Sequence, residues 1–314
     1  MQRQVWMRRI LYVGIVLFLF YYIVLRRRST RVFLIPSHIT EYHLRKLVND
    51  TSRPRIPRII HQTWKSEHVP SHWQETVQSV RQLNADQFEY RLWTDDQMHE
   101  FVRQVEPNFY EQTFLTYSLD IQRVDAFRYV LLYHFGGVYI DMDNGCRQSL
   151  ESLLDILETF DSHAVHLAAF PQTTPLGISN GFMIATKGHP LFRTLISRLS
   201  LFNHNYLIDY LTVMFSAGPS YLSIHEFYFD SKSSQSAIRI IDDLVYSGIY
   251  TWHTPGNSWH GNDAKVILYI YHSVRRVFRE LFYAICVILS CILVLCLSRC
   301  YLRWRRRERR LGFY

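Results

Sequence analysis

The stretch HFGGVYIDMDNG, residues 134–145, places two glycines, a short apolar run and two carboxylates within twelve residues. The preceding residues, SLDIQRVDAFRYVLLY, carry apolar side chains at helical spacing, and Gly136 and Gly137 are predicted to end that helix. VYID then predicts a short strand whose carboxyl end delivers Asp141 and Asp143. Ligands bind outside the carboxyl ends of strands in open α/β sheets, so we expect a ligand site here. Strand alternation predicts that both carboxylates point to the same side.

The residues before this stretch predict a β-α-β-α order. Ser71 and Thr94 are the expected N-caps, each with a glutamine three residues later in a capping-box pattern. Residues 179–192 add a strand, a turn and a helix. This order favours an α/β fold with a largely parallel sheet. The earlier predicted elements are a strand at 58–64, a helix at 71–83, a strand at 88–93 and a helix from Thr94.

Two uncharged apolar runs, Ile10–Leu25 and Leu281–Ser298, lie near the ends of the chain. Each is long enough, at the short end, to cross a bilayer as a helix. Arg26 follows the first run directly, without a small-residue cleavage site, which favours a signal anchor over a cleaved signal peptide. Seven arginines follow the second run, so the positive-inside rule places the tail, and with two spans the N-terminus, in the cytosol.

The predicted organisation places one lumenal domain between two transmembrane helices. Short spans favour the thinner membranes of the early secretory pathway, and Asn49 lies in a sequon that lumenal enzymes glycosylate. The predicted segments are a cytosolic N-terminus at 1–9, a transmembrane helix at 10–25, a stem at 26–54, the lumenal domain at 55–274, a transmembrane helix at 281–298 and a cytosolic arginine-rich tail at 299–314.

The charge distribution argues against a nucleic-acid partner. The whole chain has a net charge of +8, but residues 32–274 hold 18 basic and 25 acidic side chains. The basic surplus therefore flanks the predicted spans, and the middle lacks the basic footprint of a nucleic-acid surface.

The carboxylates of Asp141 and Asp143 have a chemical reason to bind a cation. Two nearby carboxylates repel each other, so without a cation one of them tends to keep its proton. A divalent metal removes that conflict, and oxygen ligands favour Mg²⁺ or Mn²⁺, which then bridge substrate phosphates.

The run D-x-x-R…L-x-x-x-G-G-x-Y-x-D-x-D, from Asp125 and Arg128 to Asp143, resembles glycosyltransferase family 32. The opening IPRIIHQTWK and the later HTPGNSWHGNDA fit the same family, and the resemblance covers about residues 55–265. Within the family, the second apolar run makes the chain similar to fungal mannosyl-inositol-phosphorylceramide synthase catalytic subunits. Members that extend N-glycans typically have one N-terminal anchor.

The resemblance implies a GT-A-type, Rossmann-like glycosyltransferase fold, and transfer of mannose from GDP-mannose to inositol-phosphorylceramide with retention. Asp141 and Asp143 would hold Mn²⁺, or Mg²⁺, together with the diphosphate. Asp125 and Arg128 match the positions that contact the donor sugar; the alternative is a surface ion pair. No catalytic nucleophile is assigned, since departure of GDP and attack on the same face need none.

Further site candidates are less specific. Trp64 either lies against guanine or is a core tryptophan, and Asn180 either lies near the donor sugar or only turns the chain into a strand. His253 is the candidate third metal ligand, with His260 as the second choice and an ordinary loop histidine as the alternative. His61 is expected to be a structural hydrogen-bonding group. Two further side chains could donate hydrogen bonds to phosphate: Ser258 and Trp259.

The resemblance also implies partners and a location: a lipid acceptor, the membrane, a multispanning regulatory subunit, and the Golgi or the endoplasmic reticulum. Two alternatives remain open at this point. One is an α-1,6-mannosyltransferase acting on N-glycans, which needs no second span. The other is a catalytically silent membrane scaffold subunit of a transferase complex, against which the intact Asp141-x-Asp143 motif argues.

Overall fold

The computed structural model describes residues 32–33, 55–173, 177–230 and 235–254, together with Tyr269, Ser273 and Arg276. The chain divides into two compact units, residues 1–258 and 259–314. Every strand and helix named below belongs to the first unit. Of the second unit the structure describes those three single residues, which are helical.

Both predicted membrane spans, residues 10–25 and 281–298, lie outside the described residues, as does Asn49. Of the helices within the described ranges, none is sufficiently long and apolar to span a bilayer. The predicted topology and segment boundaries therefore stay predictions.

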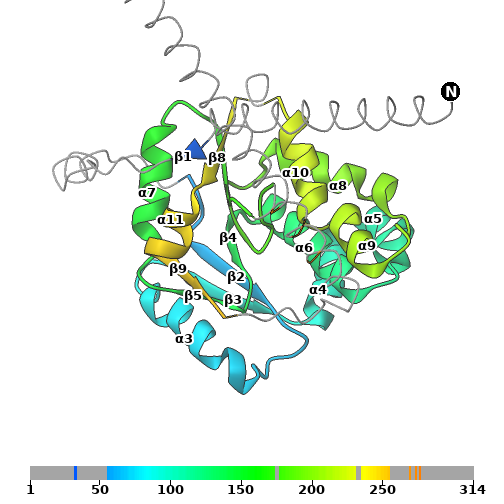
Figure 1. Ribbon diagram of the computed structural model, residues 1–314, viewed down its shortest axis with the longest axis horizontal. Coiled ribbons are helices and arrows are strands. Elements are labelled where there is room, and N and C mark those ends of the chain that lie inside the picture. Colours follow the sequence, from blue (N-terminus) through cyan, green and yellow to red (C-terminus); the bar gives the residue numbers. More distant parts are fainter. Residues whose placement is uncertain are drawn as a thin grey trace, which may run out of the picture. The chain divides into compact units, whose positions relative to one another are not determined.

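A seven-stranded sheet, in the order β1-β8-β6-β7-β4-β2-β3, forms the centre of the first unit (Figure 1). All neighbouring strands are parallel except β7, which runs antiparallel to both β4 and β6. The predicted α/β fold with a largely parallel sheet is confirmed. The strands are β1 (Val32–Phe33), β2 (Ile59–Thr63), β3 (Glu89–Trp93), β4 (Gly137–Ile140), β6 (His166–Pro171), β7 (Phe182–Ala185) and β8 (Ser236–Ile241).

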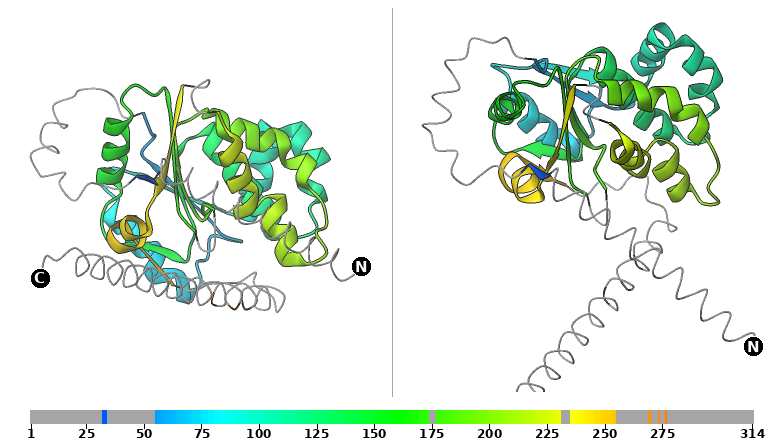
Figure 2. Two further views of the ribbon diagram at one scale, coloured as in Figure 1. Left: turned by 45° about the horizontal axis from the view of Figure 1, so that its top comes forward. Right: turned by 90° about the horizontal axis from the view of Figure 1, so that it is seen from above.

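Helices cover both faces of this sheet (Figures 1 and 2). Helices α3, α7 and α11 lie on one face, and α4, α5, α6, α8, α9 and α10 gather on the other. Their bounds are α3 (Gln74–Leu83), α4 (Asp95–Val105), α5 (Pro107–Gln112), α6 (Asp120–His134), α7 (Glu151–Phe160), α8 (Pro190–Phe202), α9 (Asp209–Ser216), α10 (Pro219–Tyr228) and α11 (Asp243–Val245), which continues as a π-helical turn, Tyr246–Tyr250.

A second, two-stranded sheet pairs β5 (Asn144–Cys146) with β9 (Thr251–His253) in antiparallel register, with Asn144 opposite His253. Strand β5 follows β4 after a three-residue turn, whereas β9 comes about a hundred residues later. This small sheet therefore carries a late segment of the chain to the carboxyl end of β4.

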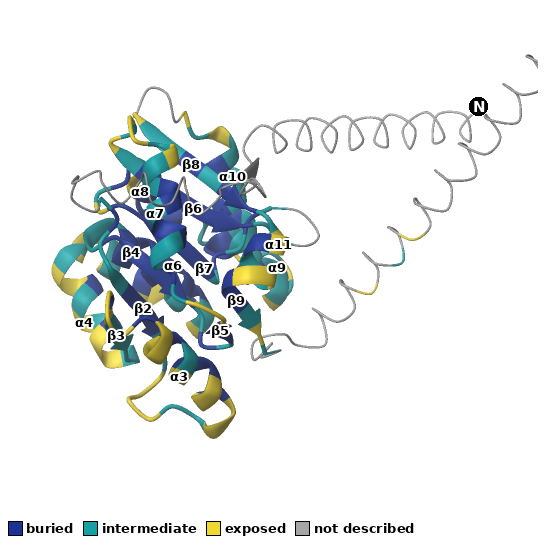
Figure 3. Cartoon of the chain, turned by 90° about the vertical axis from the view of Figure 1, so that its left-hand side faces the viewer, coloured by how far each residue is buried: buried dark blue, intermediate teal, exposed yellow. Residues whose placement is uncertain are grey.

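Strand β4 is buried along its whole length (Figure 3). Val138 and Ile140 pack in the core on the α7 side, and Tyr139 packs in the core on the α6 side. Because successive side chains alternate across a strand, the next residue, Asp141, shares the α6 side with Tyr139. The burial of both faces is typical of a central parallel strand.

The two predicted N-caps have different outcomes. The capping box of Thr94 is confirmed: Gln97 N donates to Thr94 Oγ1 at 3.3 Å and Thr94 N donates to Gln97 Oε1 at 3.0 Å. The prediction for Ser71 is wrong. A 3₁₀ turn, Ser71–Trp73, comes first, because it buries the Trp73 side chain, and α3 begins only at Gln74 without a side-chain cap.

The predicted end of α6 is confirmed. The helix ends at His134, and Gly136 adopts a φ of 69°, the left-handed conformation that glycine supplies at helix ends. Gly137 has a φ of 93°, and a Cβ there would lie 2.4 Å from the Ile59 carbonyl oxygen of β2. The glycine pair thus both ends the helix and lets β4 approach its neighbour.

Gly137 and Gly188 provide a matched test of this close approach. Gly188 also has a positive φ, 71°, but a Cβ there meets no atom within 4 Å. We expect Gly188→Ala to lower the Tm of the full-length protein in detergent by about 2–6 °C, from left-handed strain alone. Gly137→Ala should lower it at least twice as far. Equal decreases in Tm for the two variants would show that the close approach to β2 does not add to the destabilisation.

Candidate active site

The carboxylate of Asp141 is held by a chain of hydroxyl groups from two parallel strands. The Tyr139 hydroxyl donates to Asp141 Oδ1 at 2.8 Å. Thr63 Oγ1, at the end of β2, lies 2.9 Å from the same hydroxyl. Because the tyrosine proton points to the carboxylate, Thr63 is the donor to the tyrosine oxygen. The backbone N–H of Asp141 also donates to the Gly181 carbonyl at 2.8 Å.

Arg128 of α6 is a buried cation between two carboxylates. Its side chain is 6% exposed; one terminal nitrogen lies 3.0 Å from Asp141 Oδ1 and the other 3.2 Å from Asp125 Oδ1. The guanidinium also lies over the Tyr139 ring, 4.8 Å from its centroid. The alternative of a surface ion pair for Asp125 and Arg128 is therefore wrong, because both side chains face the sheet.

Asn180, just before β7, joins the same group. Its Nδ2 donates to Asp125 Oδ1 at 3.0 Å, and its carbonyl accepts from Arg128 at 3.1 Å. Four of the predicted site residues thus form one network, in which three members are buried and the Asp141 side chain is 28% exposed: Asp125, Arg128, Asn180 and Asp141. Removal of one partner from a buried ion pair leaves an uncompensated charge and typically costs about 3–5 kcal/mol.

Asp143 lies in the turn between β4 and β5. Its Oδ1 accepts from Asn144 Nδ2 at 2.8 Å, its Oδ2 lies 3.1 Å from His253 Nε2, and its carbonyl accepts from Thr254 N at 2.8 Å. The predicted proximity of His253 to the acidic pair thus has a structural basis in the β5–β9 pairing. The strand ends at Ile140 and the chain turns, so strand alternation does not decide the direction of Asp143, and the predicted shared side of the two carboxylates stays a prediction.

The two carboxylates nevertheless share one electrostatic environment. Burial raises the pKa of Asp141 to about 7, against the opposing effect of Arg128, and the charge of Asp143 raises it further. The hydrogen bond to Asp143 raises the pKa of His253. The protein alone therefore disfavours a second negative charge at this position, which is the condition that a bound cation relieves.

The two oxygens of the Asp141 carboxylate have different surroundings. Oδ1 takes both the Arg128 and Tyr139 contacts, whereas Oδ2 has no hydrogen-bond or ion-pair partner among the described residues. A Cβ on Gly181 would lie 2.7 Å from Oδ2, so the glycine keeps that side open. The donor set suits a hard divalent cation through Asp141 and Asp143. Within the described ranges, no three His, Cys, Asp or Glu side chains are grouped closely enough to bind a metal.

Trp64 directly follows β2, and His61 lies in the middle of that strand. Trp64 is partly buried and packs against Trp73, Val77 and Met142, the residue between the two aspartates. His61 is fully buried; its Nδ1 accepts from Trp93 Nε1 at 3.2 Å, so its Nε2 donates to the Gly136 carbonyl at 3.1 Å. Burial lowers the pKa of His61 to about 4, so the neutral ring is favoured, and its two ring contacts match the expected structural hydrogen-bonding group.

Three predicted candidates, Ser258, Trp259 and His260, lie outside the described residues. Conversely, the sequence analysis missed Tyr139, Gly181 and Tyr246. Tyr139 carries a usable signal, since it stands two residues before Asp141 on a strand. Tyr246 carries none: its hydroxyl donates to Asn144 Oδ1 at 2.8 Å from 102 residues away.

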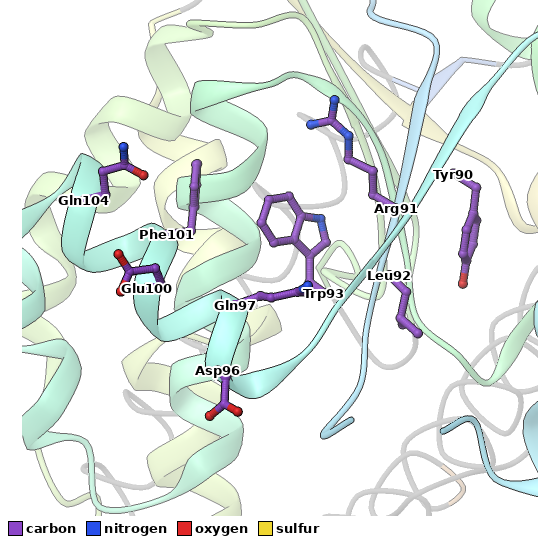
Figure 4. A pocket seen from close by; sticks show the side chains of 9 residues that line it. All are labelled: Tyr90, Arg91, Leu92, Trp93, Asp96, Gln97, Glu100, Phe101 and Gln104. Carbon is purple, nitrogen blue, oxygen red and sulfur yellow. The ribbon is translucent and has the colours of Figure 1, made fainter. Parts of the chain in front are cut away.

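A separate hollow of about 720 Å³ lies between β3 and α4 (Figure 4). Apolar and charged side chains both line it, among them Trp93, Phe101, Arg91, Asp96 and Glu100. None of the predicted site residues lines it. The candidate site at the end of β4 is therefore separate from this hollow.

Comparison with known proteins agrees with the position of the motif. The family described as glycosyltransferase sugar-binding region containing DXD motif matches residues 70–160. Inositol phosphoceramide mannosyltransferase 1 of Schizosaccharomyces pombe is 37% identical over 291 residues, which cover 89% of this chain and 86% of that protein. The chain belongs to the inositol phosphoceramide mannosyltransferase family. It is a glycosyltransferase, so the alternative of a catalytically silent scaffold is wrong.

Alignments with other relatives cover a smaller share of those proteins. Mannosyl phosphorylinositol ceramide synthase SUR1 of Saccharomyces cerevisiae is 38% identical over 221 residues, 68% of this chain and 54% of that protein. Among solved structures, the PaToxG glycosyltransferase aligns over 55% of this chain and 69% of its own, with a TM-score of 0.42 and 13% identity.

Gly181 provides a direct test of the open side of Asp141. We expect Gly181→Ala to reduce transferase activity by at least about tenfold, because the new methyl group displaces the Asp141 carboxylate; a loss of 1.4 kcal/mol in transition-state stabilisation suffices. Gly188→Ala, which is also strained but lies outside the site, should keep the activity per folded molecule. The comparison requires initial rates normalised to folded protein. Full activity of Gly181→Ala would place the reaction elsewhere.

Proposed function

We propose that this enzyme transfers mannose from GDP-mannose to inositol-phosphorylceramide, with retention and with a divalent metal. The observation that carries the proposal is the carboxylate pair of Asp141 and Asp143, set at the end of a central strand in a chain of this family. Its relatives are named as mannosyltransferases and synthases of inositol phosphoceramide products.

Asp141 Oδ2 and Asp143 would hold Mn²⁺ or Mg²⁺, with His253 as the proposed third ligand. When bound, the metal neutralises charge on the departing nucleoside diphosphate. Thr63, Tyr139 and Arg128 fix Asp141 by its other oxygen, so that Oδ2 faces the ligand before binding. A carboxylate oriented in advance loses less entropy on binding a ligand.

Arg128 and its partners support a role in donor binding. The buried Nε of Arg128 has no hydrogen-bond partner among the described residues, and an unsatisfied buried donor costs about 1–3 kcal/mol. An oxygen of the donor sugar would satisfy it once the groups that now cover the Nε move apart. Asp125 and Asn180 hold Arg128 in place and complete the proposed sugar subsite, with Trp64 as the proposed contact for guanine. Ser258 and Trp259 remain the proposed donors to phosphate.

Retention needs no protein nucleophile in this proposal. Asp125 and the bound oxygen of Asp141 are both engaged by Arg128, which makes each a poor nucleophile. Departure of the diphosphate and attack by the acceptor hydroxyl on the same face would preserve the anomeric configuration. The role of the residues is then to hold the donor and exclude water.

The acceptor and location follow from the membrane topology proposed from the sequence. Two spans would hold the domain at the lumenal leaflet of the Golgi or the endoplasmic reticulum, where a lipid acceptor lies. A multispanning regulatory subunit would contact those spans. An N-glycan acceptor stays the alternative, since it would not use the second span.

Asp143→Asn tests the metal site. We expect it to lower transfer of labelled mannose to inositol-phosphorylceramide in Mn²⁺-containing membranes by at least about 100-fold, because a metal contributes several kcal/mol of charge stabilisation. Chelation should do the same to the wild type. The control, Asp86→Asn, changes an exposed carboxylate after α3 and should keep full activity.

Two outcomes would contradict separate parts of the proposal. Normal turnover of Asp143→Asn would remove the metal site. If the wild type, with its regulatory subunit present, mannosylates oligosaccharide and no lipid, the proposed lipid acceptor is wrong. The proposed metal site is unaffected by that result.

A further inference from the structure

Residues 243–250, here called the α11 segment, have an inner and an outer side. On the inner side Val245 and Tyr250 pack into the core, and the Tyr246 ring lies 5.1 Å from that of Phe182. On the outer side Leu244 is 79% exposed and Ile249 is 44% exposed. Figure 3 shows this segment as an exposed surface above a buried core. Two large apolar side chains thus face outward from one short turn.

Polar groups of the segment are already paired. Asp243 accepts from the Ser247 hydroxyl at 2.7 Å. Arg147, an exposed cation, donates to the carbonyls of Ser247 at 3.2 Å and Thr251 at 2.9 Å. Backbone groups with partners can be brought against an apolar medium at lower cost. The same surface carries the Asp242 and Asp243 carboxylates beside the Arg147 cation, so it has no net attraction for anionic headgroups and any contact with lipid depends on the two apolar side chains.

The start of the chain limits how far this segment can be from a bilayer. Strand β1 pairs with the carboxyl end of β8, with Phe33 opposite Ile241, and the α11 segment begins two residues later. The first apolar run ends at Leu25, so six residues separate it from Val32. Even fully extended, that connection spans at most about 25 Å.

We propose that the α11 segment is the surface by which the domain contacts the lipid bilayer, with Leu244 and Ile249 inserted among the headgroups. The inference rests on the membrane span of the proposed function. It connects the bilayer to the site, since Tyr246 donates to Asn144, which donates to Asp143. An acceptor headgroup would then meet the carboxylates without its lipid leaving the leaflet.

Depth-dependent quenching tests the contact directly. The full-length protein is placed in phospholipid nanodiscs. Four cysteines are first changed to serine: Cys286, Cys291 and Cys296 of the second apolar run, and Cys300 of the tail. Buried Cys146 is kept. A fluorophore is attached at Leu244→Cys, at Ile249→Cys, or at the control Leu201→Cys, whose native leucine is 67% exposed on α8. Nitroxide-labelled lipid should quench the first two at least about fivefold more strongly than the control, because short-range contact decides quenching. Equal quenching at all three overturns the proposal.

Activity provides the second readout. Leu244→Glu with Ile249→Glu should raise the apparent KM for bilayer-embedded acceptor by at least about tenfold, because the loss of even one of the two apolar contacts corresponds to that factor. Leu201→Glu should not change it. An unchanged KM in the double variant would contradict the proposed contact between the α11 segment and the bilayer. If the wild type makes no mannosylated lipid, the proposed function fails, but the quenching result still decides the membrane contact.

Discussion

One buried guanidinium holds the candidate site together. Arg128 joins α6 to the end of β4 through Asp141 and to the loop before β7 through the Asn180 carbonyl. A buried cation requires partners, and Asp125 and Asp141 supply two carboxyl groups to one guanidinium. With Asp143 nearby, three carboxyl groups gather around one guanidinium, and burial together with that crowding raises the pKa of Asp141. That imbalance is the physical reason that this strand end suits a divalent cation and not an anion.

The sheet topology explains how residues distant in sequence meet there. The parallel strands β2 and β4 end at the same edge and bring Thr63 beside Tyr139. Strand β7 is antiparallel, so its amino end, with Gly181, reaches that same edge. A sheet of parallel strands alone would place the start of β7 at the opposite edge. The single reversed strand is therefore what allows the glycine to lie beside Asp141.

The sequence predicted the elements that depend on local chemistry. The Thr94 capping box, the glycine end of α6 and the strand before Asp141 follow from spacing and backbone preference. Ser71 failed because burial of Trp73 outweighed its capping preference. The contact among Asp125, Arg128 and Asp141 was predictable because the three residues belong to one sequence motif. The link from Tyr246 to Asn144 could not be predicted, since neither periodicity nor spacing relates two positions 102 residues apart.

The β5–β9 pair has a consequence for biosynthesis. Strand β5 carries Asn144 and must remain unpaired until β9, with His253 opposite it, has been made. At about 5–20 residues per second, the roughly one hundred intervening residues take about 5–20 s to translate. During that interval the nascent chain holds both aspartates but has no histidine beside them. The contact between His253 and Asp143 is thus among the last of the described domain to form.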